Sequence, residues 1–147
     1  MLTQTEADML IAMRKIFADR RPVSIQPGAP YARELYGDDK HEKFLLDIWM
    51  GKLRLSKIKH QARARKCVVL VRLDINSAPH TNPDGKKIGG THIHVYREEY
   101  DDKWAYPVPP EFRNTADQRV TFKDFCAYCK IDNPPPFSVR QVQQTLL

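Results

Sequence analysis

The stretch that decides the fold is Cys67-Val68-Val69-Leu70-Val71-Arg72-Leu73-Asp74-Ile75. Its aliphatic first half predicts a strand that is buried on both faces and therefore lies inside a β-sheet. Arg72 and Asp74 interrupt the apolar run near its end. Because side chains alternate along a strand, these two charged residues share one face.

Further strands are expected on both sides of residues 67–75. Residues 44–49 and 52–59 form the preceding pair, with a turn at Met50-Gly51. Residues 91–97 and 103–108 form the following pair, and Pro107 favours an edge position for the last strand. The connections are short, which predicts an antiparallel sheet.

Helices are expected near both ends of the chain. Thr3 and Glu6 have the spacing of a capping box, and apolar residues then recur at helical spacing up to Phe17. Thr121 and Asp124 predict the start of a second helix, and Ser138 predicts the start of a short final helix. Residues 22–40 are expected to form an ordered loop. The fold class is therefore α+β: one domain over residues 1–147, with an antiparallel sheet of about five strands whose one face the terminal helices cover.

Composition favours a protein of the cytoplasm. The chain has 147 residues, 41% of them hydrophobic, and no apolar run near the roughly 20 residues that a membrane helix needs. The first residues lack the features of a signal peptide, and three cysteines, an odd number, suggest reduced thiols. We therefore expect no membrane partner.

The positive charge is concentrated in one segment. The net charge is +6, and residues 52–66 hold seven basic residues and no acidic one. Removing these seven from the 24 basic residues leaves 17, against 18 acidic residues. Such a segment is typical of a surface that binds RNA or another polyanion, although basic segments also serve solubility. The predicted nucleic-acid-binding residues are Lys52, Arg54, Lys57, Lys59, Arg63, Arg65 and Lys66.

A polar stripe is expected on the strand at residues 91–97. Strand alternation points Ile93 and Val95 toward the core and the intervening polar side chains toward the other face. If this strand pairs with residues 67–75, Arg72 and Asp74 lie beside the stripe. The candidate catalytic residues are Arg72, Asp74, His80, His92, His94, Tyr96 and Lys103.

Two chemistries fit these residues. Two histidines can act as general base and general acid, with Arg72 or Lys103 stabilising charge on a phosphate, which suits metal-independent cleavage of RNA without any cofactor. Alternatively, His80, His92 and His94 form a set that zinc or a non-haem metal accepts. The plain alternative is that the histidines only pack on the strand. Cys126-x-x-Cys129 is interpreted as a pair of buried free thiols.

Two resemblances bear on function. The run from Arg72 to Asn76, the turn His80-Thr81-Asn82-Pro83-Asp84-Gly85 and the stretch from His92 to Glu98 resemble an uncharacterised family of small bacterial and phage proteins. The order of elements resembles, at the level of fold only, the RelE-like and EndoU/barnase-like ribonuclease toxins. In that resemblance, His92 and His94 would stand for the catalytic histidines and Lys103 or Arg72 for the cationic stabiliser.

The leading prediction is a nucleic-acid-interacting protein, and an endoribonuclease of a toxin–antitoxin or phage-conflict system if it is an enzyme. One alternative is a non-enzymatic phage or mobile-element protein that inhibits a host defence nuclease through its basic arm and sheet face. A His-ligated metal-binding protein is the other. The partners expected beside RNA are a cognate antitoxin or a defence-system protein.

Overall fold

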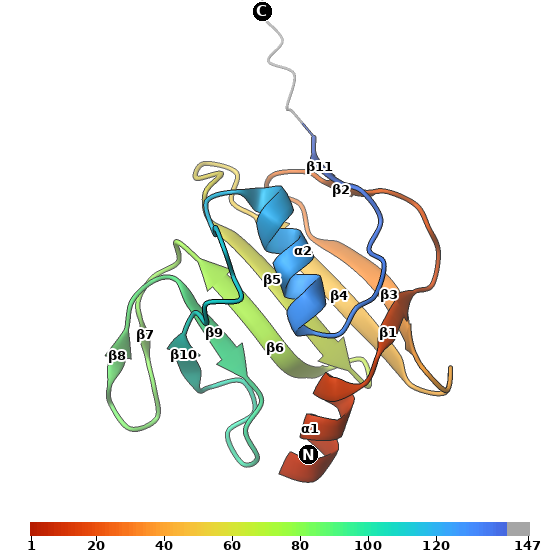
Figure 1. Cartoon of the computed structure of the whole chain (residues 1–147). Coiled ribbons are helices and arrows are strands. Elements are labelled where there is room, and N and C mark those ends of the chain that lie inside the picture. Colours follow the sequence, from red (N-terminus) through yellow and green to blue (C-terminus); the bar gives the residue numbers. More distant parts are fainter. Residues whose placement is uncertain (141–147) are drawn as a thin grey trace, which may run out of the picture.

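The computed structural model describes residues 1–140, which form two helices and eleven strands (Figure 1). The helices are α1 (Gln4–Ala12) and α2 (Gln118–Tyr128). The strands are β1 (Lys15–Phe17), β2 (Val23–Ile25), β3 (Tyr31–Gly37), β4 (Lys43–Met50), β5 (Ile58–Ala64), β6 (Val68–Ile75), β7 (His80–Thr81), β8 (Lys87–Ile88), β9 (His92–Val95), β10 (Ala105–Pro107) and β11 (Phe137–Val139).

The main sheet has seven strands in the order β1-β3-β4-β5-β6-β9-β10, and all its neighbouring strands are antiparallel. The predicted α+β class and antiparallel sheet are confirmed, although the sheet is larger than the five strands expected. β6 lies between β5 and β9, inside the sheet as its apolar sequence predicts. β10, which ends at Pro107, is an edge strand. Two small sheets, β7-β8 and β2-β11, lie outside the main one.

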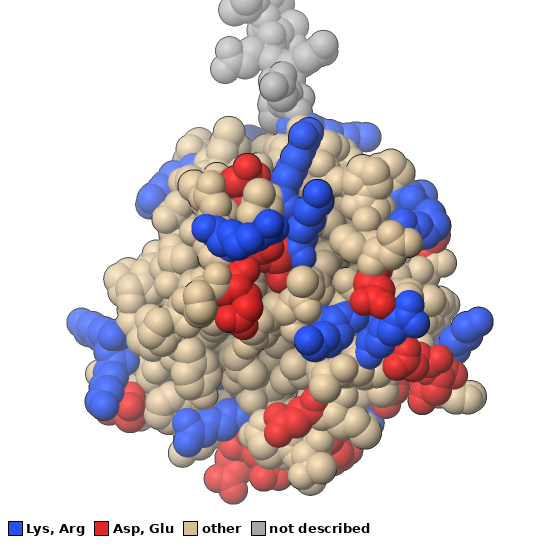
Figure 2. Space-filling view, in the orientation of Figure 1, with Lys and Arg blue, Asp and Glu red and all other residues tan. Residues whose placement is uncertain are grey.

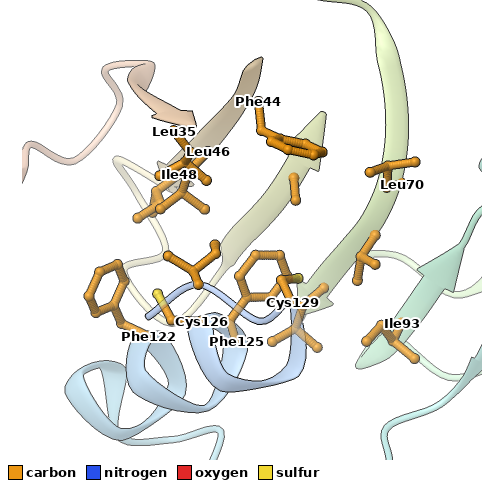
Figure 3. Packing of buried hydrophobic residues seen from close by; sticks show 14 of the residues in the cluster. Leu35, Phe44, Leu46, Ile48, Leu70, Ile93, Phe122, Phe125, Cys126 and Cys129 are labelled. Carbon is orange, nitrogen blue, oxygen red and sulfur yellow. The ribbon is translucent and has the colours of Figure 1, made fainter. Parts of the chain in front are cut away.

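The core lies between the main sheet and α2. Alternate residues of β4, including Phe44, Leu46 and Ile48, are buried on the face that α2 covers (Figure 3). Phe122 and Phe125 of α2 point into this layer. Figure 3 also shows Cys126 of α2 and Cys129, the C-cap residue of this helix, on the sheet-facing side, and both are buried, as predicted. Burial raises the pKa of the Cys129 thiol to about 12, so this thiol is protonated and unreactive at neutral pH.

Helix α1 ends earlier than its apolar spacing predicts. The capping box of Thr3 and Glu6 is present, but the helix stops at Ala12 and residues 15–17 pair with β3. Lys15 lies just beyond the helix, and its buried ammonium group donates to carbonyls at the ends of both helices. Its three acceptors are Ile11 O, Met13 O and Cys129 O, at 3.1, 2.8 and 2.8 Å.

Other differences from the sequence prediction have local causes. The expected loop at residues 22–40 contains β2 and β3, since buried residues alternate there with exposed ones. The expected strand at residues 52–59 is mostly a loop, because β5 begins only at Ile58. The side chain of Asp117, not of Thr121, caps α2 by accepting from the amides of Arg119 and Val120.

The prediction of a final helix is wrong at its start, because residues 137–139 form the strand β11, which pairs with β2. Residues 141–147, its remainder, lie outside the described residues. Within residues 1–140, neither helix has the length and apolar character that would let it cross a lipid bilayer.

Candidate metal centre

The pairing of β6 with β9 brings four predicted site residues together. The register sets Asp74 opposite His92 and Arg72 opposite His94, so the expected pairing of these strands is confirmed. Leu73 pairs with Ile93 between them and faces the core. By strand alternation the four polar side chains project from the sheet face that α2 leaves uncovered.

Two loops close over this cluster. The hairpin β7-β8 brings His80 to ring-centroid distances of 4.7 Å from His94 and 5.7 Å from His92. Gly89 and Asp102 contribute main-chain carbonyl groups from either side. As a result His92 and His94 are each 1% exposed, although they occupy the sheet face opposite α2.

The hydrogen bonds of the two strand histidines define where their protons lie. Nδ1 of His92 is 2.7 Å from Gly89 O, and Nδ1 of His94 is 2.7 Å from Asp102 O. A carbonyl oxygen only accepts, so each Nδ1 carries a proton and donates it. In the neutral rings, Nε2 is therefore an unprotonated acceptor. Both Nε2 atoms face Asp74 Oδ2, at 3.2 Å for His92 and 3.4 Å for His94.

The Asp74 carboxyl group is ionised at neutral pH. Burial raises its pKa, but the contact with His94 and the charges of Arg72 and Lys59 outweigh burial, so the pKa lies below its ordinary value. A carboxylate oxygen and two unprotonated ring nitrogens thus converge. Arg72 donates to His94 Nε2, and a proton or a metal ion between Asp74 Oδ2 and the ring nitrogens would relieve the remaining repulsion between these acceptors.

The spacing of these atoms suits a metal ion. Oδ2 of Asp74 and one ring nitrogen from each of His92 and His94 lie within 4.8 Å of one another. Two ligands bound at about 2.1 Å in tetrahedral geometry are separated by about 3.4 Å, close to the distances of 3.2 and 3.4 Å from Asp74 Oδ2 to the two Nε2 atoms. The two histidine nitrogens lie within 4.8 Å of each other and would come to about 3.4 Å on binding. Metal-bound histidines also donate their other ring N–H to a carbonyl or carboxylate group, as both do here.

His80 is placed differently from the other two histidines. Its Nε2 is 2.7 Å from Lys103 O, so Nε2 donates there and Nδ1 remains as the acceptor. Its ring lies beside those of His92 and His94, but its nitrogens are outside the group of atoms that converge on one point. The ligand atoms that lie close together therefore come from two of the three predicted histidines and from Asp74.

Arg72 borders the cluster. Its guanidinium group donates to Asp102 Oδ2 at 2.9 Å and to the unprotonated Nε2 of His94 at 3.0 Å. Its Nε is 3.2 Å from the second carboxylate oxygen of Asp74, Oδ1. A metal ion bound by His94 would displace one N–H of Arg72, while Asp102 would still hold the guanidinium group.

Two predicted site residues do not contribute their side chains. The hydroxyl group of Tyr96 donates to Leu2 O at 2.7 Å and is buried in the core near α1. Strand β9 ends at Val95, so the alternation that was expected to place Tyr96 beside the histidines does not extend to it. Lys103 has an exposed side chain and contributes only its carbonyl group, which binds His80.

Sequence reasoning missed the groups that close the site. Asn82 binds the edge strand β10 as another strand would: its Nδ2 donates to Ala105 O at 2.9 Å and its Oδ1 accepts from Ala105 N at 2.8 Å. Asp102 supplies both a carboxylate to Arg72 and a carbonyl to His94. Neither residue belongs to a recognisable motif, so only the pairing of distant segments reveals their roles.

The predicted basic segment does not form one arm. Lys52, Arg54 and Lys57 lie in the loop before β5, whereas Arg65 and Lys66 lie in the turn after it. The seven residues of β5 separate these ends by about 20 Å, at about 3.3 Å for each residue. Lys59 and Arg63 lie between them on the open sheet face, and the role of all seven in nucleic-acid binding stays a prediction.

A protein-family model described as a family of unknown function (DUF6978) matches residues 2–131. No curated protein and no solved structure matches the chain. The resemblance to an uncharacterised family is therefore confirmed, whereas the fold-level resemblance to RelE-like and EndoU/barnase-like ribonucleases has no support.

Proposed function

Since the chain belongs to this family of unknown function, we propose its function from geometry alone: it binds a divalent transition metal, zinc or iron(II), through Asp74, His92 and His94. One observation carries the proposal. Both Nδ1 atoms are committed to main-chain carbonyls, and both Nε2 atoms face the same carboxylate oxygen at distances that suit bound ligands.

The donor set limits the kind of metal. Two imidazoles and one carboxylate suit zinc or iron(II) and suit calcium or magnesium poorly, because the latter prefer oxygen ligands. His80, on the covering hairpin, is the nearest further imidazole and is the candidate fourth ligand after a change in its ring orientation. Binding would then join β6, β9 and the β7-β8 hairpin.

Metal-independent cleavage of RNA is served less well by this geometry. A general acid or base must come within hydrogen-bonding distance of the reacting group. His92 and His94 are buried, and both nitrogens of each ring already have a polar neighbour. We therefore expect purified protein to leave RNA intact, and His92→Ala to make no difference in that assay. An antitoxin or a defence-system protein as partner and a place in the cytoplasm stay predictions.

The test is metal content and zinc affinity. Protein purified without chelator is analysed for bound metals by mass spectrometry, and chelator-treated protein is titrated with zinc by calorimetry. We expect about one metal ion per chain, and a loss of zinc affinity of at least about 100-fold in Asp74→Asn or His92→Gln. His41→Gln, which alters an exposed histidine in the β3–β4 turn, is the matched control and should bind as the unaltered chain does.

Arg72→Gln separates a metal centre from a purely structural polar cluster. Removing a positive charge beside the ion and a competitor for His94 Nε2 should tighten zinc binding, by about 10-fold if one hydrogen bond to a charged group is relieved. Folded wild-type protein that neither contains metal nor binds zinc would overturn the proposal. Zinc binding that survives in both Asp74→Asn and His92→Gln would place the metal elsewhere.

A further inference from the structure

Ion pairing distinguishes the two ends of β5. At the end that leads into β6, Arg63 pairs with Asp47 at 2.7 Å, and Arg65 pairs with Glu42 at 3.2 Å and Glu6 at 3.4 Å. At the other end, Lys52, Arg54 and Lys57 have no ion pair with any residue from 1 to 140. The two arginines at one end of β5 are thus paired with carboxylates, whereas Lys66 beside them and the three cations of the β4–β5 loop are not, among the described residues.

This loop presents its side chains from a fixed backbone. Gly51 N donates to Lys57 O at 2.7 Å, Lys57 N donates to Arg54 O at 3.0 Å, and Asn76 Nδ2 donates to Ser56 O at 3.2 Å. A Cβ atom at Gly51 would lie 2.4 Å from Arg54 O, so only glycine allows this close turn. Leu53 stands at the tip and is 97% exposed.

Helix α2 adds two more cations beside the loop. Gln118 Nε2 donates to Leu55 O at 3.3 Å, which joins the start of α2 to the loop; Figure 1 shows the loop at the upper left of this helix. Arg119 and Lys123 are exposed, one turn apart, and neither is in an ion pair within the described chain. In Figure 2, Lys and Arg side chains lie over the upper part of this face with some acidic ones among them, and others are spread over its sides. We name Lys52, Arg54, Lys57, Arg119 and Lys123 the basic pole.

We propose that the basic pole binds the phosphate backbone of a nucleic-acid duplex, with Leu53 contacting the bases in a groove. Cations that lack protein partners release counterions when they neutralise phosphates, which is the main source of such affinity. Apolar side chains between cations are used by proteins that insert a wedge between base steps. Phe122 and Phe137 at this end are buried, whereas Trp49 is partly exposed and its ring lies 5.9 Å from Lys57 Nζ, so the comparison with single-stranded RNA is part of the test.

The experiment measures fluorescence anisotropy of a labelled 20-base-pair DNA duplex at several salt concentrations. Five phosphate contacts predict a slope of log affinity against log salt of about −4.5. Replacing Lys52, Arg54 and Lys57 together by Gln should bring the slope closer to zero by about 2.7. Leu53→Ser should weaken binding by about tenfold and leave the slope unchanged, because it removes an apolar contact only.

The matched control removes the same charge from the opposite end of the sheet. Lys40, Lys43 and Lys66 are exposed residues in or beside the β3–β4 and β5–β6 turns, and their joint replacement by Gln should leave the slope as it was. Equal losses in both triple variants would mean that net charge alone is responsible and would overturn the proposal. It would also fail if single-stranded RNA of 20 nucleotides, or vesicles with 30% anionic lipid, bound more tightly than the duplex.

Discussion

Replacing His60 by leucine should stabilise the protein. His60 lies on β5 beneath α2, with its ring centroid 5.4 Å from that of Phe125 and 6.5 Å from that of Phe122. It is fully buried, and neither ring nitrogen has a hydrogen-bond partner among the described residues. A buried polar group without a partner costs about 1–3 kcal/mol. Leucine has a similar volume and no polar atoms, so His60→Leu should raise the free energy of unfolding by that amount at pH 7.

The difference should grow as the pH falls. Burial lowers the pKa of His60 to about 3 from its ordinary value of 6.5. Between these values the unfolded chain binds a proton that the folded chain does not, so the wild type loses stability as the pH falls below 6.5. The loss is about 1.4 kcal/mol for each pH unit, or about 2 kcal/mol at pH 5. His60→Leu lacks this loss, so its advantage at pH 5 should exceed that at pH 7 by about 2 kcal/mol.

Urea unfolding followed by circular dichroism at pH 7 and pH 5 measures both quantities. His41→Leu controls for the loss of a histidine, because His41 is exposed and should change little at either pH. A His60→Leu variant that is less stable than the wild type at pH 7, with a difference that does not change at pH 5, would refute the reasoning. It would mean that the ring is solvated or hydrogen-bonded in the folded protein.

Three further substitutions each test a single set of hydrogen bonds in the fold. Tyr96→Phe removes the hydrogen bond to Leu2 O and should lower the free energy of unfolding in urea by about 1–2 kcal/mol without altering zinc affinity. A large loss of zinc affinity would mean that Tyr96 takes part in the site. Asn82→Ala removes both bonds to Ala105, so hydrogen exchange should accelerate in residues 80–88 but not in β4–β6; uniform acceleration would contradict a local role. Lys15→Met leaves three carbonyls without their donor and should cost about 3 kcal/mol or more in thermal unfolding; an unchanged melting temperature would be the contrary result.

The residues of the site could be predicted from the sequence because they lie on two regular strands. Strand alternation places His92 and His94 on one face and Arg72 and Asp74 on one face, and antiparallel pairing of the two strands then sets these pairs side by side. The sequence predicts strand β5 at residues 52–59, six residues too early, because leucine recurs there. The buried residues of the actual strand are His60 and three small or aliphatic ones, whereas Leu53 in the preceding loop is exposed. Hydrophobic pattern therefore pointed to the wrong segment.

The burial of the site could not be predicted in the same way. It depends on the hairpin β7-β8 and on the main-chain carbonyls of Gly89, Asp102 and Lys103. Carbonyl groups are present at every residue, so no sequence pattern marks the ones that bind histidine rings. The ion pairs of Arg63 and Arg65 could not be predicted from the sequence either, because their partners lie on distant segments. These pairs neutralise two of the seven positive charges of the basic segment.

A crystal structure of zinc-loaded protein, with diffraction data on both sides of the zinc absorption edge, tests the metal centre most directly. We predict one anomalous peak about 2.0–2.2 Å from Asp74 Oδ2 and from Nε2 of both His92 and His94, with Arg72 turned toward Asp102. A peak elsewhere on the surface would contradict the proposed function. So would a folded protein at saturating zinc with Arg72 still bound to His94 and no peak between the three ligands.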